Sequence, residues 1–117
     1  MTFQDERTLG TRDGRRLDHL AEWLEVTLGP RLVAYAIGVT PSEVCRYAQG
    51  ESPVADVETR LRNLYTATWF IASTDGPGTA HAWLMQPKAE LDNRAPADLI
   101  RGGASPTAEW FSVTQVY

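Results

Sequence analysis

Helix stop and start signals recur at short intervals, and they constrain the fold more than any other feature of the sequence. Gly29 and Pro30 end one helical pattern and begin the next, because proline fits the first position of a helix. Gly38 is suited to a left-handed helix cap. Thr40 then precedes Glu43 at the spacing of a capping box. These signals favour a bundle of short helices.

Apolar residues between the breaks repeat at helical spacing. The first helix, starting near Arg15, is predicted from Leu17, Leu20, Ala21, Leu24 and Leu28. Asp56 is predicted to cap a longer helix that ends near Ala72. The other helices are expected at 30–37, 41–49, 79–86, 96–101 and, after residue 104, in a short piece before an extended tail. No strand alternation is convincing, so the predicted fold class is all-α.

The clearest break in the chain is STDGPG at residues 73–78, where Gly76-Pro77-Gly78 reads as a hinge. It suggests three parts: a flexible leader at 1–14, a helix-turn-helix-like domain at 15–72, and a small helical domain with a tail at 73–117. No apolar run reaches the about 20 residues of a membrane helix. The polar start and the lone Cys45 lead us to expect a cytoplasmic protein without a membrane partner.

Residues 30–49 have the pattern of a helix-turn-helix. Such a motif needs a small residue where two helices cross, a glycine in the turn and apolar residues at fixed offsets. The residues that meet these needs are Ala34, Ile37, Gly38, Val39, Val44 and Tyr47. The alternative is a helical hairpin that only packs against the rest of the chain.

The second helix of this pattern supplies the candidate DNA-binding residues Thr40, Ser42, Arg46 and Gln49. Arg46 and Gln49 have the chemistry to read guanine and adenine edges, and Ser42 to contact phosphate. The whole chain has 11 basic and 15 acidic residues, a net charge of −4, and residues 29–70 are neutral. Because DNA affinity depends on positive charge, operator binding would need dimerisation or a partner.

Enzyme chemistry finds little support in the sequence. Cys45 lies on the predicted second helix, and His19 and His81 are far apart along the chain. No glycine loop for phosphate and no paired carboxylates stand out. We therefore expect no catalytic residue, no metal and no cofactor, and we expect Cys45 to be an inert, half-buried thiol.

A second pattern lies at residues 83–103. It consists of WLMQP at 83–87, Leu91, and PADLIRGG at 96–103. Together with the helix-turn-helix-like half, it resembles antitoxins of the Xre/MbcA/ParS class over about residues 17–103. Lys88 and Asn93 stand where that family usually has asparagine and glycine.

The resemblance implies a function through a protein partner. Such antitoxins bind RES-domain toxins, which degrade NAD⁺, and their C-terminal region covers the toxin and enters its active site. Their N-terminal half mediates dimerisation and can bind the operon's own promoter. The expected assembly is a homodimer or a hetero-oligomer with the toxin, and operator DNA is a further candidate partner. A stand-alone helix-turn-helix regulator and a small adaptor without a DNA role are the alternatives.

The end of the chain independently suggests a partner surface. Aromatic and aliphatic residues cluster there, and exposed aromatic residues are typical anchors of interfaces. The candidate toxin-binding residues are Arg94, Arg101, Trp110, Phe111, Val113, Gln115, Val116 and Tyr117. The terminal carboxylate at Tyr117 can meet cationic groups that hold pyrophosphate. The alternative is that Trp110 and Phe111 fold back onto the core of this chain.

Overall fold

The computed structural model describes residues 16–112, which form α-helices and a single 3-10 turn, without a strand in this part of the chain. The predicted all-α class is therefore confirmed. The leader predicted at residues 1–14 and most of the predicted tail, residues 113–117, lie outside the described residues.

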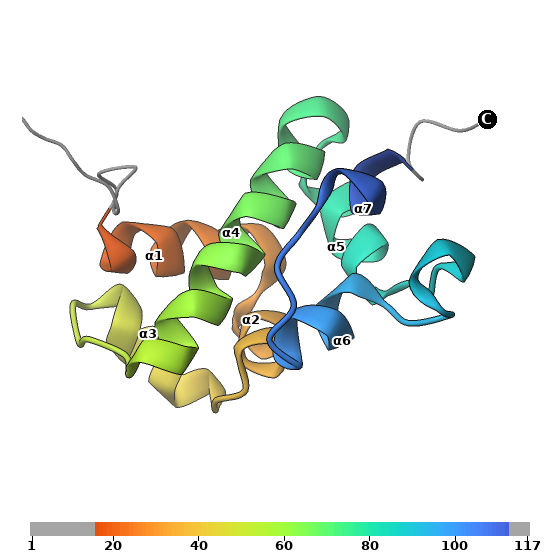
Figure 1. Ribbon diagram of the computed structural model, residues 1–117. Helices are drawn as coiled ribbons and strands as arrows, with labels where there is room; N and C mark the ends of the chain where they lie inside the picture. Colours follow the sequence, from red (N-terminus) through yellow and green to blue (C-terminus); the bar gives the residue numbers. More distant parts are fainter. Residues whose placement is uncertain (1–15, 113–117) are drawn as a thin grey trace, which may run out of the picture.

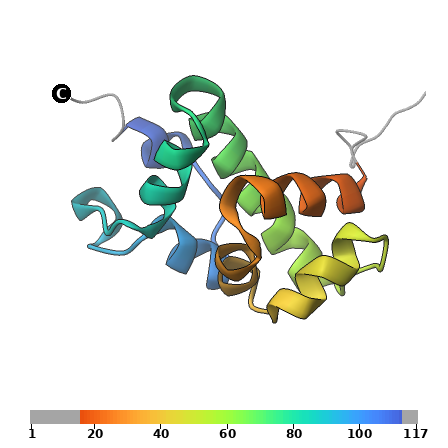
Figure 2. The same cartoon turned by 180° about the vertical axis from the view of Figure 1, so that it is seen from behind.

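The first four helices follow the predicted breaks closely. They are α1 (Leu17–Leu28), α2 (Pro30–Ile37), α3 (Pro41–Ala48) and the long α4 (Ala55–Asp75). Helix α4 runs diagonally through the molecule, with α1 and α3 toward one end and α5, α6 and α7 toward the other (Figures 1 and 2). The arrangement is a compact all-α globule.

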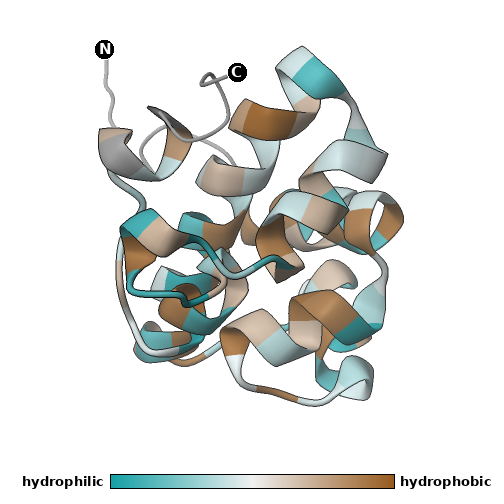
Figure 3. Cartoon of the chain, turned by 90° about the vertical axis from the view of Figure 1, so that its right-hand side faces the viewer, coloured by the Kyte–Doolittle hydropathy of each residue, from teal (hydrophilic) through white to brown (hydrophobic). Residues whose placement is uncertain are grey.

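The second half of the chain contains shorter elements. They are α5 (Pro77–Met85), the 3-10 turn η1 (Ala89–Leu91), α6 (Pro96–Arg101) and α7 (Ala108–Ser112). An isolated antiparallel bridge joins Lys88 and Arg94 around η1. Hydropathy colouring shows apolar and polar residues alternating along the helices, as expected where one face is buried (Figure 3).

Two predictions about helix ends were wrong. Val54, not Asp56, is the N-cap of α4, and Asp56 lies in the first turn, where a carboxylate interacts favourably with the helix dipole. Helix α4 also continues past Ala72 to Asp75, and α5 already begins at Pro77. The predicted hinge is thus a tight connection at Gly76, which has a φ of 94°.

The start of α3 has the predicted capping box. The Thr40 hydroxyl accepts a hydrogen bond from the Glu43 backbone N–H at 3.2 Å, and the Thr40 N–H donates to the Glu43 carboxylate at 2.9 Å. The bond from the Thr40 N–H, and after it a bond from the Thr40 hydroxyl to the same carboxylate at 3.1 Å, hold the pKa of Glu43 below its usual value. The turn before α3 depends on Gly38, which has the left-handed φ of 80°.

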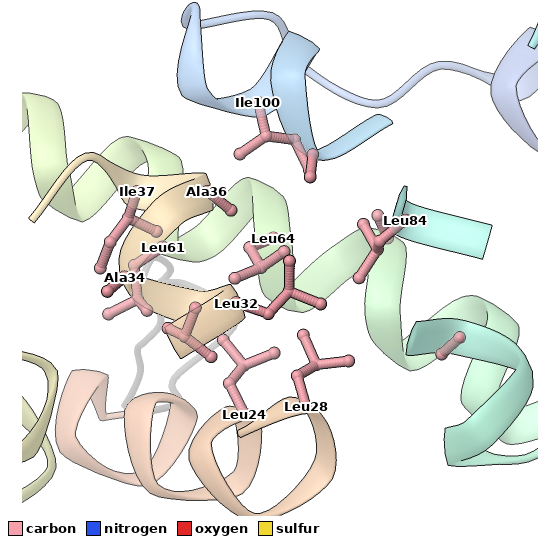
Figure 4. Close-up of a cluster of buried hydrophobic side chains, with 14 of the residues drawn as sticks. Leu24, Leu28, Leu32, Ala34, Ala36, Ile37, Leu61, Leu64, Leu84 and Ile100 are labelled. Atoms are coloured by element: carbon pink, nitrogen blue, oxygen red, sulfur yellow. The ribbon is translucent and has the colours of Figure 1, made fainter. Parts of the chain in front are cut away.

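Helix α2 is the centre of the core. Most of its side chains are buried, namely Leu32, Val33, Ala34, Ala36 and Ile37. Figure 4 shows Leu32, Ala34, Ala36 and Ile37 among Leu24 and Leu28 of α1, Leu61 and Leu64 of α4, Leu84 of α5 and Ile100 of α6. Burying a large aliphatic side chain contributes about 1.5–3 kcal/mol, so this cluster is a major source of stability.

The core does not stop at the predicted domain boundary. One hydrophobic cluster includes buried residues before residue 73 and after it. The segment between α6 and α7 also lies along α4, where the Asn63 amide donates to the Ala104 carbonyl and to the Ser105 hydroxyl, both at 3.4 Å. The division into two domains stays a prediction.

A pair of glycine substitutions tests the backbone conformation at the end of α2. Gly38→Ala is expected to lower the free energy of unfolding by about 1–2 kcal/mol, because an L side chain is strained at this left-handed φ. Gly78→Ala is the control and is expected to raise it by about 0.5 kcal/mol, because Gly78 lies within α5 and a Cβ there meets open space. Chemical denaturation measures both, and effects of the same sign would contradict this account.

Candidate functional site

The four candidate DNA-binding residues lie on the outer side of α3. All four are exposed, and the opposite face of the helix packs on the core. Val44 and Tyr47 are buried on that inner face, with exposed fractions of 0% and 5%, as predicted. The outer side of α3 is therefore a continuous polar surface.

Two of these four side chains are engaged within the chain. The Thr40 hydroxyl takes part in the capping box. The Arg46 guanidinium donates to the Glu51 carboxylate at 3.0 Å and lies 4.0 Å from that of Glu43. Contact of Arg46 with a base would require it to leave these carboxylates, which lowers the net gain from such a contact.

Arg60 is a basic residue near this surface that the sequence reasoning did not single out. It lies on α4, half-buried, and its Nη1 is 3.9 Å from the position that a Cβ on Gly38 would occupy. Its Nε atom is buried without a hydrogen-bond partner among the described residues. The position of Arg60 depends on how α4 packs against the turn between α2 and α3, and helical spacing in the sequence does not predict this packing.

Cys45 packs on the inner edge of α3. Its thiol donates to the Glu25 carboxylate of α1 at 2.9 Å and is half-buried. That hydrogen bond, with burial and the negative charge of Glu25, raises the pKa of the Cys45 thiol. The predicted half-burial of Cys45 is confirmed, and because the thiolate is the reactive form, the raised pKa favours the less reactive thiol.

The aromatic residues of α7 pack onto this chain's own core. Trp110 is only 5% exposed, and Phe111 is half-buried. The Phe111 ring lies 4.3 Å from the ring of Phe70 and stacks at 5.6 Å on that of Trp83, centroid to centroid. Of the two interpretations of Trp110 and Phe111, the structure supports packing within the chain.

The remaining candidate toxin-binding residues differ in their surroundings. Val113, Gln115, Val116 and Tyr117 lie outside the described residues. Arg94 is exposed, and its backbone forms the isolated bridge with Lys88. Arg101 is also exposed but is held against α2, as described next.

Tyr35, Asp98 and Arg101 join α6 to α2. The Tyr35 hydroxyl donates a hydrogen bond to the Asp98 carboxylate. The Arg101 guanidinium donates to the Tyr35 carbonyl at 2.6 Å and lies 4.7 Å from the centre of the Tyr35 ring, a cation–π contact. Tyr35 was not predicted to take part in any site, and its partners lie more than 60 residues away in the sequence.

A cavity of about 480 Å³ opens between α2, α5 and α6, beside this contact. We call it the α2–α6 groove. Arg31, Tyr35, His81 and Asp98 provide its polar lining. Its size falls within the range of ordinary binding pockets.

Residues 16–112 were predicted to contain neither a membrane helix nor a metal site. No helix in this range has the length and apolarity needed to cross a membrane. The same residues contain no group of three or more histidine, cysteine, aspartate or glutamate side chains placed to hold a metal ion.

Comparison of the sequence with protein-family models, with curated proteins and with solved structures finds no match.

The packing of α7 predicts a large effect for one tryptophan and a small one for another. Trp110→Ala is expected to lower the free energy of unfolding by about 3 kcal/mol, because it empties a buried site. Trp69→Ala, at a position 49% exposed, is the control and is expected to lower it by less than about 1 kcal/mol. Denaturant unfolding measures both, and equal effects would mean that α7 does not pack as described.

The Tyr35–Asp98 contact predicts a dependence on alkaline pH. The hydrogen bond to the Asp98 carboxylate, foremost, raises the pKa of Tyr35 above its ordinary value of 10.0. Its stabilising effect is therefore present below about pH 10 and is lost as the pH rises through the folded-state pKa. Tyr35→Phe is expected to be less stable than the wild type at neutral pH, with a difference that shrinks at high pH. Urea unfolding across this range measures it, and a constant difference would contradict the assignment.

Proposed function

We propose that this protein is the antitoxin of a type II toxin–antitoxin system and inhibits a RES-domain toxin that degrades NAD⁺. The proposal starts from the pattern at residues 83–103 and from the helix-turn-helix-like pattern before it. The resemblance alone names the toxin as the partner, so the proposal is tested by measuring binding to the toxin and its inhibition.

One backbone observation carries the proposal furthest. Asn93 stands near the position where the family usually has glycine, and it adopts a φ of 62°. Asp92, next to it, has a φ of 59°. Glycine is the usual residue in this left-handed region, and asparagine and aspartate are the usual substitutes. The departure from the family pattern thus keeps the backbone conformation that glycine would favour.

The apolar positions of the pattern also behave as an anchored unit. Trp83, Leu84, Leu91, Pro96 and Ile100 are all buried. They hold α5, η1 and α6 together against the core, while most residues between Leu84 and Ala95 remain exposed. A recognition domain needs such a scaffold to present its surface in a fixed conformation.

We further propose that α2 and α3 form a helix-turn-helix whose outer side contacts operator DNA. Its support is the buried Ala34 between the helices, the left-handed Gly38 in the turn, and the exposed Ser42, Arg46 and Gln49. The Arg60 guanidinium beside the turn adds a cation close to this surface. Since Glu43 and Glu51 offset Arg46, tight binding is expected only for a dimer or for the complex with the toxin.

Because Trp110 is buried in this chain's own core, the segment proposed to inhibit the toxin is reduced to the residues after α7. We assign inhibition to residues 113–117, with Val113, Gln115, Val116 and Tyr117 as the candidate contacts. Arg94 and Arg101 remain candidate contacts from the folded part. Removal of residues 113–117 leaves the packed α7 intact, so it separates inhibition from folding.

Co-expression with the RES-domain toxin of the same operon tests the proposal. The full chain is expected to form a complex and to preserve cellular NAD⁺. A chain ending at Ser112 is expected to retain the complex but to inhibit at least about tenfold less, because about 1.4 kcal/mol of active-site contact would be missing. Equal inhibition by both chains would exclude the role of residues 113–117, and the lack of a complex with the full chain would exclude the antitoxin function.

The exposed polar side of α3 supports the second candidate, a stand-alone transcriptional regulator. A mobility-shift assay with the upstream DNA, with and without the toxin, separates the two functions. Tight binding by the chain alone, together with no toxin complex, would favour the regulator. In either case Arg46→Ala is expected to weaken DNA binding, and unchanged binding at every salt concentration would exclude α3 as the reading helix.

A further inference from the structure

We propose that the α2–α6 groove is the main docking surface for the toxin and receives an apolar side chain that has a carboxylate beside it. This inference rests on the proposed antitoxin function. It adds a surface in the folded part of the chain that the sequence pattern did not indicate.

The groove offers an apolar floor that is open to solvent. Leu32 of α2, Met85 of α5 and Ala97 of α6 contribute to it. Met85 is 56% exposed and Tyr35, at the rim, is 47% exposed, so both leave apolar surface uncovered. Methionine adapts its shape easily and is common at binding surfaces, and tyrosine is a frequent interface anchor.

The charge around the groove is opposite to that of the whole chain. Helices α2 and α5 contain no acidic residue, and α6 contains only Asp98. The Asp98 carboxylate already accepts the Tyr35 hydroxyl. The same three helices carry two basic residues, Arg31 and Arg101, against that one acidic residue, on a chain whose net charge is −4 with histidine counted as neutral. A carboxylate on the partner therefore meets a locally basic surface, which favours its approach.

Arg31 is the cation best placed to receive this carboxylate. It is exposed on the first turn of α2, it lines the groove, and no ion pair holds it within the described residues. Arg101, by contrast, is engaged with Tyr35. An acidic group of the toxin can thus pair with Arg31 without breaking a bond in this chain.

The groove also exists before binding. The Tyr35–Asp98 hydrogen bond and the Arg101 contact fix α6 against α2, and buried Leu84 and Ile100 hold α5 and α6 to the core. A surface that is already formed loses less conformational entropy on association than one that must be ordered. These features suit a docking site that holds the toxin while residues 113–117 act at its active site.

Affinity measurements on the full-length chain with the purified toxin test the inference. Arg31→Glu and Met85→Glu are expected to weaken binding at least about tenfold each, and Arg31→Lys, which keeps the charge, by less than about threefold. Arg16→Glu, at a 72% exposed side chain just before α1, and Val26→Glu, at an 83% exposed position of α1, are matched controls outside the groove and are expected to bind like the wild type. Thermal unfolding of each variant shows whether it is folded.

The outcomes separate the two proposals. Wild-type binding together with unchanged binding by folded Arg31→Glu and Met85→Glu would overturn the groove and leave the antitoxin function standing. Equal losses in the groove variants and the two controls would also overturn it, because the effect would then be non-specific. The lack of any complex with the wild-type chain would overturn the antitoxin function and the groove together.

Discussion

The burial of α2 is the constraint on which the rest of the structure depends. This helix contributes Leu32, Val33, Ala36 and Ile37 to the core, and it packs against helices from both halves of the chain. Pro30 starts this short helix and the left-handed Gly38 ends it, so the chain can turn away at both ends. Other helices can then pack around it. Its buried side holds the molecule together, and its exposed residues Arg31 and Tyr35 belong to the groove.

The two proposed surfaces consequently share one helix. On one side, α2 leads through Gly38 into α3, whose outer face carries the candidate DNA contacts. On another, Tyr35 holds α6 through Asp98 and Arg101. Charge is distributed unevenly among the helices: α2, α5 and α6 together carry more basic than acidic residues, although the whole chain has a net charge of −4.

Most of the fold was predictable because its signals are local. Proline and glycine positions gave the ends of α2 and α6, and the Thr40–Glu43 spacing gave the start of α3. Helix α4 was placed less well, since it continues to Asp75 through exposed polar residues, where the Ser73 and Thr74 hydroxyls donate back to carbonyls of the same helix. The site was harder to predict: the outer face of α3 follows from helical spacing, but the Tyr35–Asp98 contact and the burial of Trp110 depend on how distant helices pack.

The central claim is that α2 joins both halves of the chain in one hydrophobic core. Native-state hydrogen exchange tests it most directly, because it reports the free energy of opening at each amide. We expect the slowest amides of α2, such as that of Ile37, and those of α6, such as that of Ile100, to exchange only through global unfolding, with the same free energy. Exchange of the Ile100 amide through a smaller opening that leaves Ile37 protected would contradict this account.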